Sequence, residues 1–106
     1  PILLQLFQSQ MFFMIYIMVY MDINELISIV KKKLLKEINI ESLQIEDKSF
    51  LHKHHSGNQE GKFHLKLIIF SKELKKMNKI ESNKKIYKIL DIELKNFIHS
   101  IQILIY

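Results

Sequence analysis

The chain has 106 residues, of which 48% are apolar and 25% are charged, a balance that supports one small globular domain and excludes a disordered polymer. It contains no cysteine, so a disulfide framework, a thiolate metal site and a cysteine nucleophile are excluded. The formal net charge of +5 favours an acidic partner, but every basic residue is lysine. The bidentate arginine forks that read guanine or clamp phosphate are therefore missing, which argues against sequence-specific nucleic-acid recognition.

The first twenty residues are uncharged and differ from the rest of the chain. Met11 to Tyr20 is an unbroken apolar run, but Gln5, Gln8, Ser9 and Gln10 interrupt the segment before it. A membrane span normally needs about 20 apolar residues, and a targeting leader normally carries basic residues. We expect residues 1–20 to be an extension that the fold does not need, with a degenerate leader and a membrane anchor as alternatives. The domain is then 21–106, and the compartment stays open between the cytoplasm and mitochondria or another organelle.

The domain is predicted to begin with a helix. Asp22 is placed as its N-cap, and Glu25 three residues later completes a capping-box arrangement. Lys31 to Lys33 are expected largely outside. One apolar face follows at helical spacing, formed by Ile23, Leu26, Ile27, Val30, Leu34 and Ile38.

Two strands joined by a polar loop come next. Leu43 and Ile45 alternate with polar residues, which predicts a short half-buried strand. The loop, Lys53 to Lys62, holds both glycines of the chain. In the second strand one face carries Phe63, Leu65, Leu67 and Ile69, and the other carries His64, Lys66, Ile68 and Phe70.

The remaining chain predicts a short helical turn over Ser71 to Met77, a longer helix from about Ser82 and a last strand from Ile98 to Tyr106. The element order is α-β-β-α-α-β, which indicates a single small α+β domain with a three-stranded mixed sheet and helices on one face. The stripe of the longer helix is Ile86, Ile89, Leu90, Leu94 and Phe97.

Connection rules predict where the histidines lie. The loop lets the first two strands pair antiparallel, and a helical crossover makes the second and third strands parallel. Both the loop and the start of the last strand then lie at one end of the sheet. His52 and His99 are therefore expected to converge there, although they are far apart in the sequence.

The motifs of 21–106 resemble the BolA family. Asp47-Lys48-Ser49 with His52 corresponds to the family's Asp-Glu-Ser-x-x-His, with Lys48 in place of the Glu, and His64-Leu65 with a strand ending in Ser71 corresponds to its His-Phe strand. Ile86-Tyr87 with Leu90, Glu93-Leu94 and finally Ile98-His99 follow in the family's order and spacing. The resemblance implies a class II KH-like fold. The family's basic Arg-His-Arg before the long helix is replaced by Ser82-Asn83-Lys84, which weakens a nucleic-acid role.

The resemblance also implies a function. BolA-like proteins pair with monothiol glutaredoxins, together with glutathione, and share a 2Fe-2S cluster whose histidine ligands would here be His52 and His99. His54 and His55 are substitutes from the same loop, and neutral imidazole suits iron. The partner must bring the thiolates. We expect a non-enzymatic adaptor in iron–sulfur trafficking or iron regulation. Without its partner, 21–106 is expected to be a monomer that holds no cluster and does not associate stably with membranes.

Each of these histidines also has a purely structural interpretation. The loop histidines are equally typical of a solvated loop, His99 of a partly buried structural histidine beside Ile101, and His64 of a structural residue. The alternative function is a nucleic-acid-binding transcriptional regulator, although the chain lacks the Gly-x-x-Gly loop with which KH domains clamp RNA. Its surface would be the lysine group Lys75, Lys76, Lys79, Lys84 and Lys85.

Overall fold

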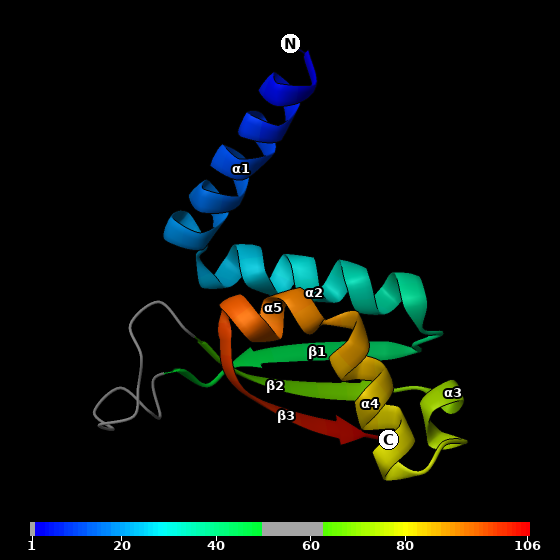
Figure 1. The fold of residues 1–106 in the computed structure, drawn as a ribbon. Helices are drawn as coiled ribbons and strands as arrows, with labels where there is room; N and C mark the ends of the chain where they lie inside the picture. Colours follow the sequence, from blue (N-terminus) through cyan, green and yellow to red (C-terminus); the bar gives the residue numbers. More distant parts are fainter. Residues whose placement is uncertain (1, 50–62) are drawn as a thin grey trace.

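The computed structural model describes residues 2–49 and 63–106, and it arranges them as a three-stranded sheet with helices (Figure 1). The predicted α+β architecture and mixed sheet are confirmed. In chain order the elements are α1 (Ile2–Tyr20), α2 (Ile23–Glu37), β1 (Ser42–Asp47), β2 (Phe63–Phe70), α3 (Lys72–Lys75), α4 (Lys79–Ile89), α5 (Asp91–Asn96) and β3 (Ile98–Ile105).

The sheet has the order β1-β2-β3, with β2 in the centre. β1 pairs antiparallel with β2, so that Ser42 lies opposite Phe70 and Asp47 opposite Leu65. β2 and β3 are parallel, as the helical crossover through α3, α4 and α5 predicts. The end of β1 and the starts of β2 and β3 therefore lie at the same end of the sheet.

One face of the sheet carries the core. Leu65, Leu67 and Ile69 alternate along β2 and are buried, as the pattern of the strand predicts. The other face of β2 ends in the exposed Phe70, whose ring stacks on Tyr106 at a centroid distance of 5.2 Å. The helices supply the opposing apolar side chains, and the buried apolar cluster consists of Leu26, Val30, Leu34, Ile38, Leu65, Leu67, Ile69, Leu74, Ile86, Leu90, Phe97 and Ile98.

The helix starts follow from their caps. Asp22 caps α2 as predicted, because its Oδ1 accepts the Glu25 N–H at 2.8 Å. Ser71 caps α3 by accepting the Leu74 N–H, and the same hydroxyl donates to the Asn39 carbonyl at 2.8 Å.

The prediction of one long helix from Ser82 was wrong. α4 starts three residues earlier, because the Asn78 side chain accepts the Glu81 N–H and caps it. The backbone leaves helical geometry at Leu90, with φ −98° and ψ 21°, and α5 begins again at Asp91. The apolar stripe continues through the break, which is why periodicity alone joined the two helices.

Residues 2–20 form α1, which extends away from the sheet and the other helices (Figure 1). Phe12 and Phe13 are exposed, and α1 contributes none of the described core residues. Within the described residues, no helix has both the length and the apolar character needed to cross a membrane. The core is thus built from residues after Met21, which packs partly against it.

Candidate functional site

The end of β1 and the starts of β2 and β3 meet at one end of the sheet. The Phe63 N–H donates to the Phe97 carbonyl at 2.8 Å, and the Lys48 N–H donates to the His64 carbonyl at 2.7 Å. These bonds bring the last residues of β1, the first of β2 and the approach to β3 together. His99 therefore lies at the end of the sheet where residues 49 and 63 flank the 50–62 segment, and its convergence with His52 stays a prediction. His52, His54 and His55 lie outside the described residues.

The motif Asp47-Lys48-Ser49 closes β1 at this end. Asp47 Oδ1 accepts the Ser49 N–H at 2.9 Å, a local turn that aspartate favours. Ser49 Oγ then accepts the backbone N–H of His64 at 3.0 Å. The aspartate and the serine thus anchor the start of β2, which gives a structural reason for both residue types at this spacing.

His99 occupies an irregularity in the pairing of β2 with β3. Phe63 pairs with Ile98, but the next residue, His64, pairs with Ser100, so His99 has no partner in the register. Such a bulge locally breaks the alternation of a strand. Ile98 is buried and His99 is exposed. The alternative of a partly buried structural His99 was therefore wrong.

His64 is buried, with 3% of its surface exposed, although it follows the open face of β2. Its Nδ1 lies 2.6 Å from Ser100 Oγ, and its ring meets the ring of His99 edge to face at a centroid distance of 5.0 Å. Within the described chain, this ring contact is the only side-chain interaction of His99, and no hydrogen bond engages its nitrogens. The exposed imidazole of His99, held against the buried ring of His64, can itself serve as a ligand for an incoming metal centre.

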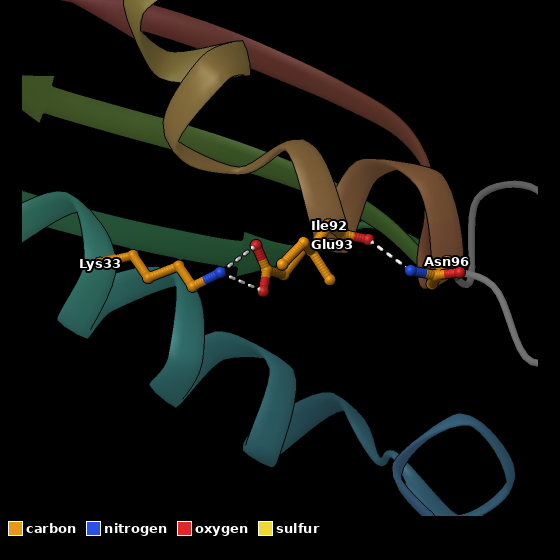
Figure 2. Close-up of polar contacts among 4 residues, drawn as sticks. All are labelled: Lys33, Ile92, Glu93 and Asn96. Atoms are coloured by element: carbon orange, nitrogen blue, oxygen red, sulfur yellow. Dashed lines mark hydrogen bonds and ion pairs between the residues drawn. The ribbon is translucent and has the colours of Figure 1, made fainter. Parts of the chain in front are cut away.

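A half-buried ion pair holds the approach to β3. Figure 2 shows the Glu93 carboxylate of α5 accepting two hydrogen bonds from Lys33 Nζ of α2, at 2.7 and 3.0 Å. The Asn96 side chain donates to the Ile92 carbonyl at 2.9 Å within α5. Because α5 runs directly into β3, the pair ties the strand start to α2. The helical pattern predicted Lys33 on the solvent side of α2. The one sequence signal for this ion pair was Glu93, a carboxylate that lies beside the apolar stripe of the later helix and needs a cationic partner when buried.

Charged side chains lie where β1 ends beside β2. Lys48 Nζ lies 2.9 Å from Glu46 Oε2, and Glu46 pairs in register with Lys66 on the neighbouring strand. The hydrogen bond from Lys48, reinforced by the charges of Lys48 and Lys66, holds the pKa of Glu46 below its ordinary value. The entry to the 50–62 loop therefore carries an ionised, paired carboxylate at neutral pH.

Except for Lys84, the lysines of the nucleic-acid alternative are distributed over three depressions, with Lys75 shared by two of them. Lys75 and Lys79 line a depression between the α3–α4 segment and β3, whereas Lys85 lines a different one beside Lys33 and Lys36. Lys85 is also paired with Glu73 at 3.2 Å. Lys75 and Lys76 line a third, apolar depression floored by Phe70 and Tyr106, and Lys84 lies exposed on α4. Residues 2–49 and 63–106 gather no group of three histidine or carboxylate side chains that could hold a metal ion.

Comparisons with known proteins identify the family and fold that this chain resembles. Residues 34–106 match the family model described as BolA-like protein. The chain is 33% identical over 73 residues to the DNA-binding transcriptional regulator BolA of Haemophilus influenzae, covering 69% of this chain and 68% of that protein. Among solved structures, BolA1 from Arabidopsis thaliana superposes with a TM-score of 0.61 and 31% identity, covering 74% of this chain and 86% of the other. The BolA domain of SufE1 from the same plant superposes with a TM-score of 0.61 and 29% identity, covering 72% of this chain and 84% of the other.

Proposed function

The chain belongs to the BolA family, and from this premise we propose that it is an adaptor that pairs with a monothiol glutaredoxin and shares a 2Fe-2S cluster with it. The observation that carries the proposal is His99. Its imidazole is exposed, its nitrogens make no hydrogen bond to the described residues, and it sits on a strand rather than on a loop. A ligand on a rigid element is held in one place before the partner arrives.

The second ligand in this proposal is His52. Ser49 is bonded to the backbone of His64, close to His99. Three peptide units join Ser49 to His52, and consecutive Cα atoms are about 3.8 Å apart, so the two Cα atoms lie within about 11 Å of each other. This short connection supports the proposal that His52 reaches this end of the sheet. His54 and His55 follow closely and are substitutes for it.

The donor set fits a shared site. The chain has no cysteine and offers imidazoles, so the thiolates would come from the glutaredoxin and its glutathione. When bound, such a cluster supplies one-electron chemistry at a higher potential than an all-thiolate cluster, because two imidazoles replace thiolates on one iron. The role of this chain is to present the imidazoles and to bind the partner, in iron–sulfur trafficking or iron regulation.

The test mixes the full chain with a cluster-loaded monothiol glutaredoxin and records the visible absorption and circular dichroism spectra. We expect the wild type to change both spectra. His99→Ala should abolish the change, because the described part of β3 offers no other imidazole, whereas His52→Ala should only weaken it since His54 and His55 remain. His64 is not a substitute because it is buried. A wild-type chain that leaves the spectra unchanged contradicts the proposal, as does a His99→Ala variant that behaves like the wild type.

A second candidate is nucleic-acid binding, favoured by the name of the Haemophilus relative. Lys75 and Lys79 are exposed and line one depression, so they are the part of the lysine group that could act together. Binding of a duplex oligonucleotide at two salt concentrations discriminates the two functions. Weak, steeply salt-dependent binding without sequence preference indicates lysine electrostatics only. Sequence-selective binding that Lys75→Ala and Lys79→Ala reduce supports the regulator.

A further inference from the structure

His64 is the buried side chain at the candidate site for which the proposed function has no use. It is one residue into β2, 3% exposed, and its ring packs edge to face on that of His99 with an interplanar angle of 63°. A buried imidazole on the open face of a sheet is unusual, because that face of β2 otherwise becomes more exposed toward Phe70. The contact with an exposed histidine indicates a specific use.

Three hydrogen bonds with described residues hold His64 in place. Its backbone N–H donates to Ser49 Oγ at 3.0 Å, and its carbonyl accepts the Lys48 N–H at 2.7 Å. Its ring Nδ1 lies 2.6 Å from Ser100 Oγ. The backbone is therefore fixed by the end of β1 and the ring by β3. A ring held in this way leaves its neighbour little freedom on the side where the two rings meet.

The bulge makes both contacts at once. Because the register skips His99, Ser100 lies opposite His64, where its hydroxyl reaches Nδ1. The same skip leaves His99 exposed beside the ring that Ser100 holds. Regular pairing would have placed His99 opposite His64 and moved Ser100 one position along. The extra residue in β3 thus allows Ser100 to bond the buried His64 while the neighbouring His99 stays exposed.

We propose that His64 is a positioning residue, which with Ser100 holds the imidazole of His99 in the orientation that a metal centre of the partner meets. This inference rests on the proposed function for the role of His99 as a ligand. An exposed histidine otherwise loses side-chain freedom on ligation, and a pre-oriented one loses less. Groups that orient metal-bound imidazoles through hydrogen bonds typically contribute about 10-fold or more to affinity, which is the upper reference for an orienting ring contact.

Ser100→Ala is the primary variant, because it removes the hydroxyl at an exposed position and leaves both histidines in place. Ser100→Thr is the matched control, since threonine keeps the hydroxyl and suits a strand. His64→Phe is a second variant that keeps a ring and removes Nδ1. Backbone amide spectra of each full-length variant establish that the fold is retained.

The first readout needs no cluster. In the labelled apo protein, the His99 ring carbon and proton shifts and its cross-relaxation with the His64 ring report their contact. We expect Ser100→Ala to shift the His99 ring signals and weaken the cross-relaxation, and Ser100→Thr to resemble the wild type. Unchanged His99 ring signals in both Ser100→Ala and His64→Phe overturn the inference.

The second readout is the complex with cluster-loaded glutaredoxin. We expect Ser100→Ala to bind about 10-fold more weakly and to alter the visible dichroism and the reduction potential, with Ser100→Thr restoring both. Weaker binding with an unaltered dichroism and potential overturns positioning in favour of a purely structural role. If the wild type itself forms no mixed complex, the proposed function fails, while the apo ring signals still decide whether His64 and Ser100 orient His99.

Discussion

Replacing Lys33 by methionine tests how strongly its ion pair with the buried Glu93 holds α5, and through α5 the start of β3. The substitution keeps an unbranched side chain on α2 and removes the only partner that the described residues give the Glu93 carboxylate. That carboxylate is 5% exposed, and it receives both of its hydrogen bonds from Lys33. The variant therefore leaves the Glu93 charge buried without a partner, which destabilises the fold more than replacing both charges would.

The magnitude follows from the exposure of the two partners. Removing one member of a fully buried pair costs about 3–5 kcal/mol. Lys33 is 35% exposed, so solvent already screens the pair and can reach the carboxylate when the lysine is gone. We expect a loss of about 2–3 kcal/mol in the free energy of unfolding. For a domain of this size, that corresponds to a fall in Tm of about 10–15 °C.

Urea unfolding of the full chain, followed by far-ultraviolet circular dichroism, measures the loss. Lys32→Met is the matched control, because Lys32 is exposed on the same helix and makes no ion pair within the described residues. It should change the free energy by less than about 0.5 kcal/mol. The double variant Lys33→Met with Glu93→Met should recover most of the stability, since an apolar pair replaces the charges. A loss for Lys33→Met no larger than that of the control refutes the reasoning.

Three further predictions concern stability and domain organisation. Ser71→Ala should lower the free energy of unfolding by about 1–2 kcal/mol in urea, because it removes the α3 cap and the bond to Asn39, and a smaller change would show that water replaces both. Glu46→Gln should destabilise the fold at neutral pH but not in acid. The folded pKa of Glu46 is depressed, so the contribution of its charge is present above the ordinary pKa and disappears as the pH falls through the lower folded value; equal losses at both pH values would contradict this. Deleting residues 1–20 should leave the amide shifts of 23–106 unchanged, and widespread shifts would show that α1 packs on the core.

The fold was predictable because its signals are periodic and local. The apolar face of α2 and the alternation in β2 identify the core directly, and Asp22 marks the start of α2. The connection rule then orients β3 without any knowledge of side-chain packing. The division between α4 and α5 was not predictable in the same way, because Leu90 keeps the apolar stripe in phase while its backbone leaves the helix.

For the site, the position of His99 was predictable, while its meeting with His52 stays a prediction. The topology predicts that His99 lies at the loop end of the sheet, and the structure confirms it. The partners of His64 were not predictable, because they depend on the register between β2 and β3 and on the conformation of a serine hydroxyl. The pattern predicted Lys33 at the surface. A helical pattern describes one helix only, so it cannot show that the buried carboxylate of Glu93 on another helix pairs with Lys33.

The exposure of His99 is the clearest case in which sequence pattern and register disagree. Strict alternation places His99 on the face of Ile101, Ile103 and Ile105, which are partly buried, and so predicts a half-buried histidine. The skipped position in the pairing with β2 separates His99 from that face while Ile98 stays in the core. A ligand must reach a partner, and a core-facing imidazole cannot. The bulge therefore leaves the His99 imidazole exposed while its ring still contacts the buried ring of His64, the arrangement that the proposed role of His99 as a ligand requires.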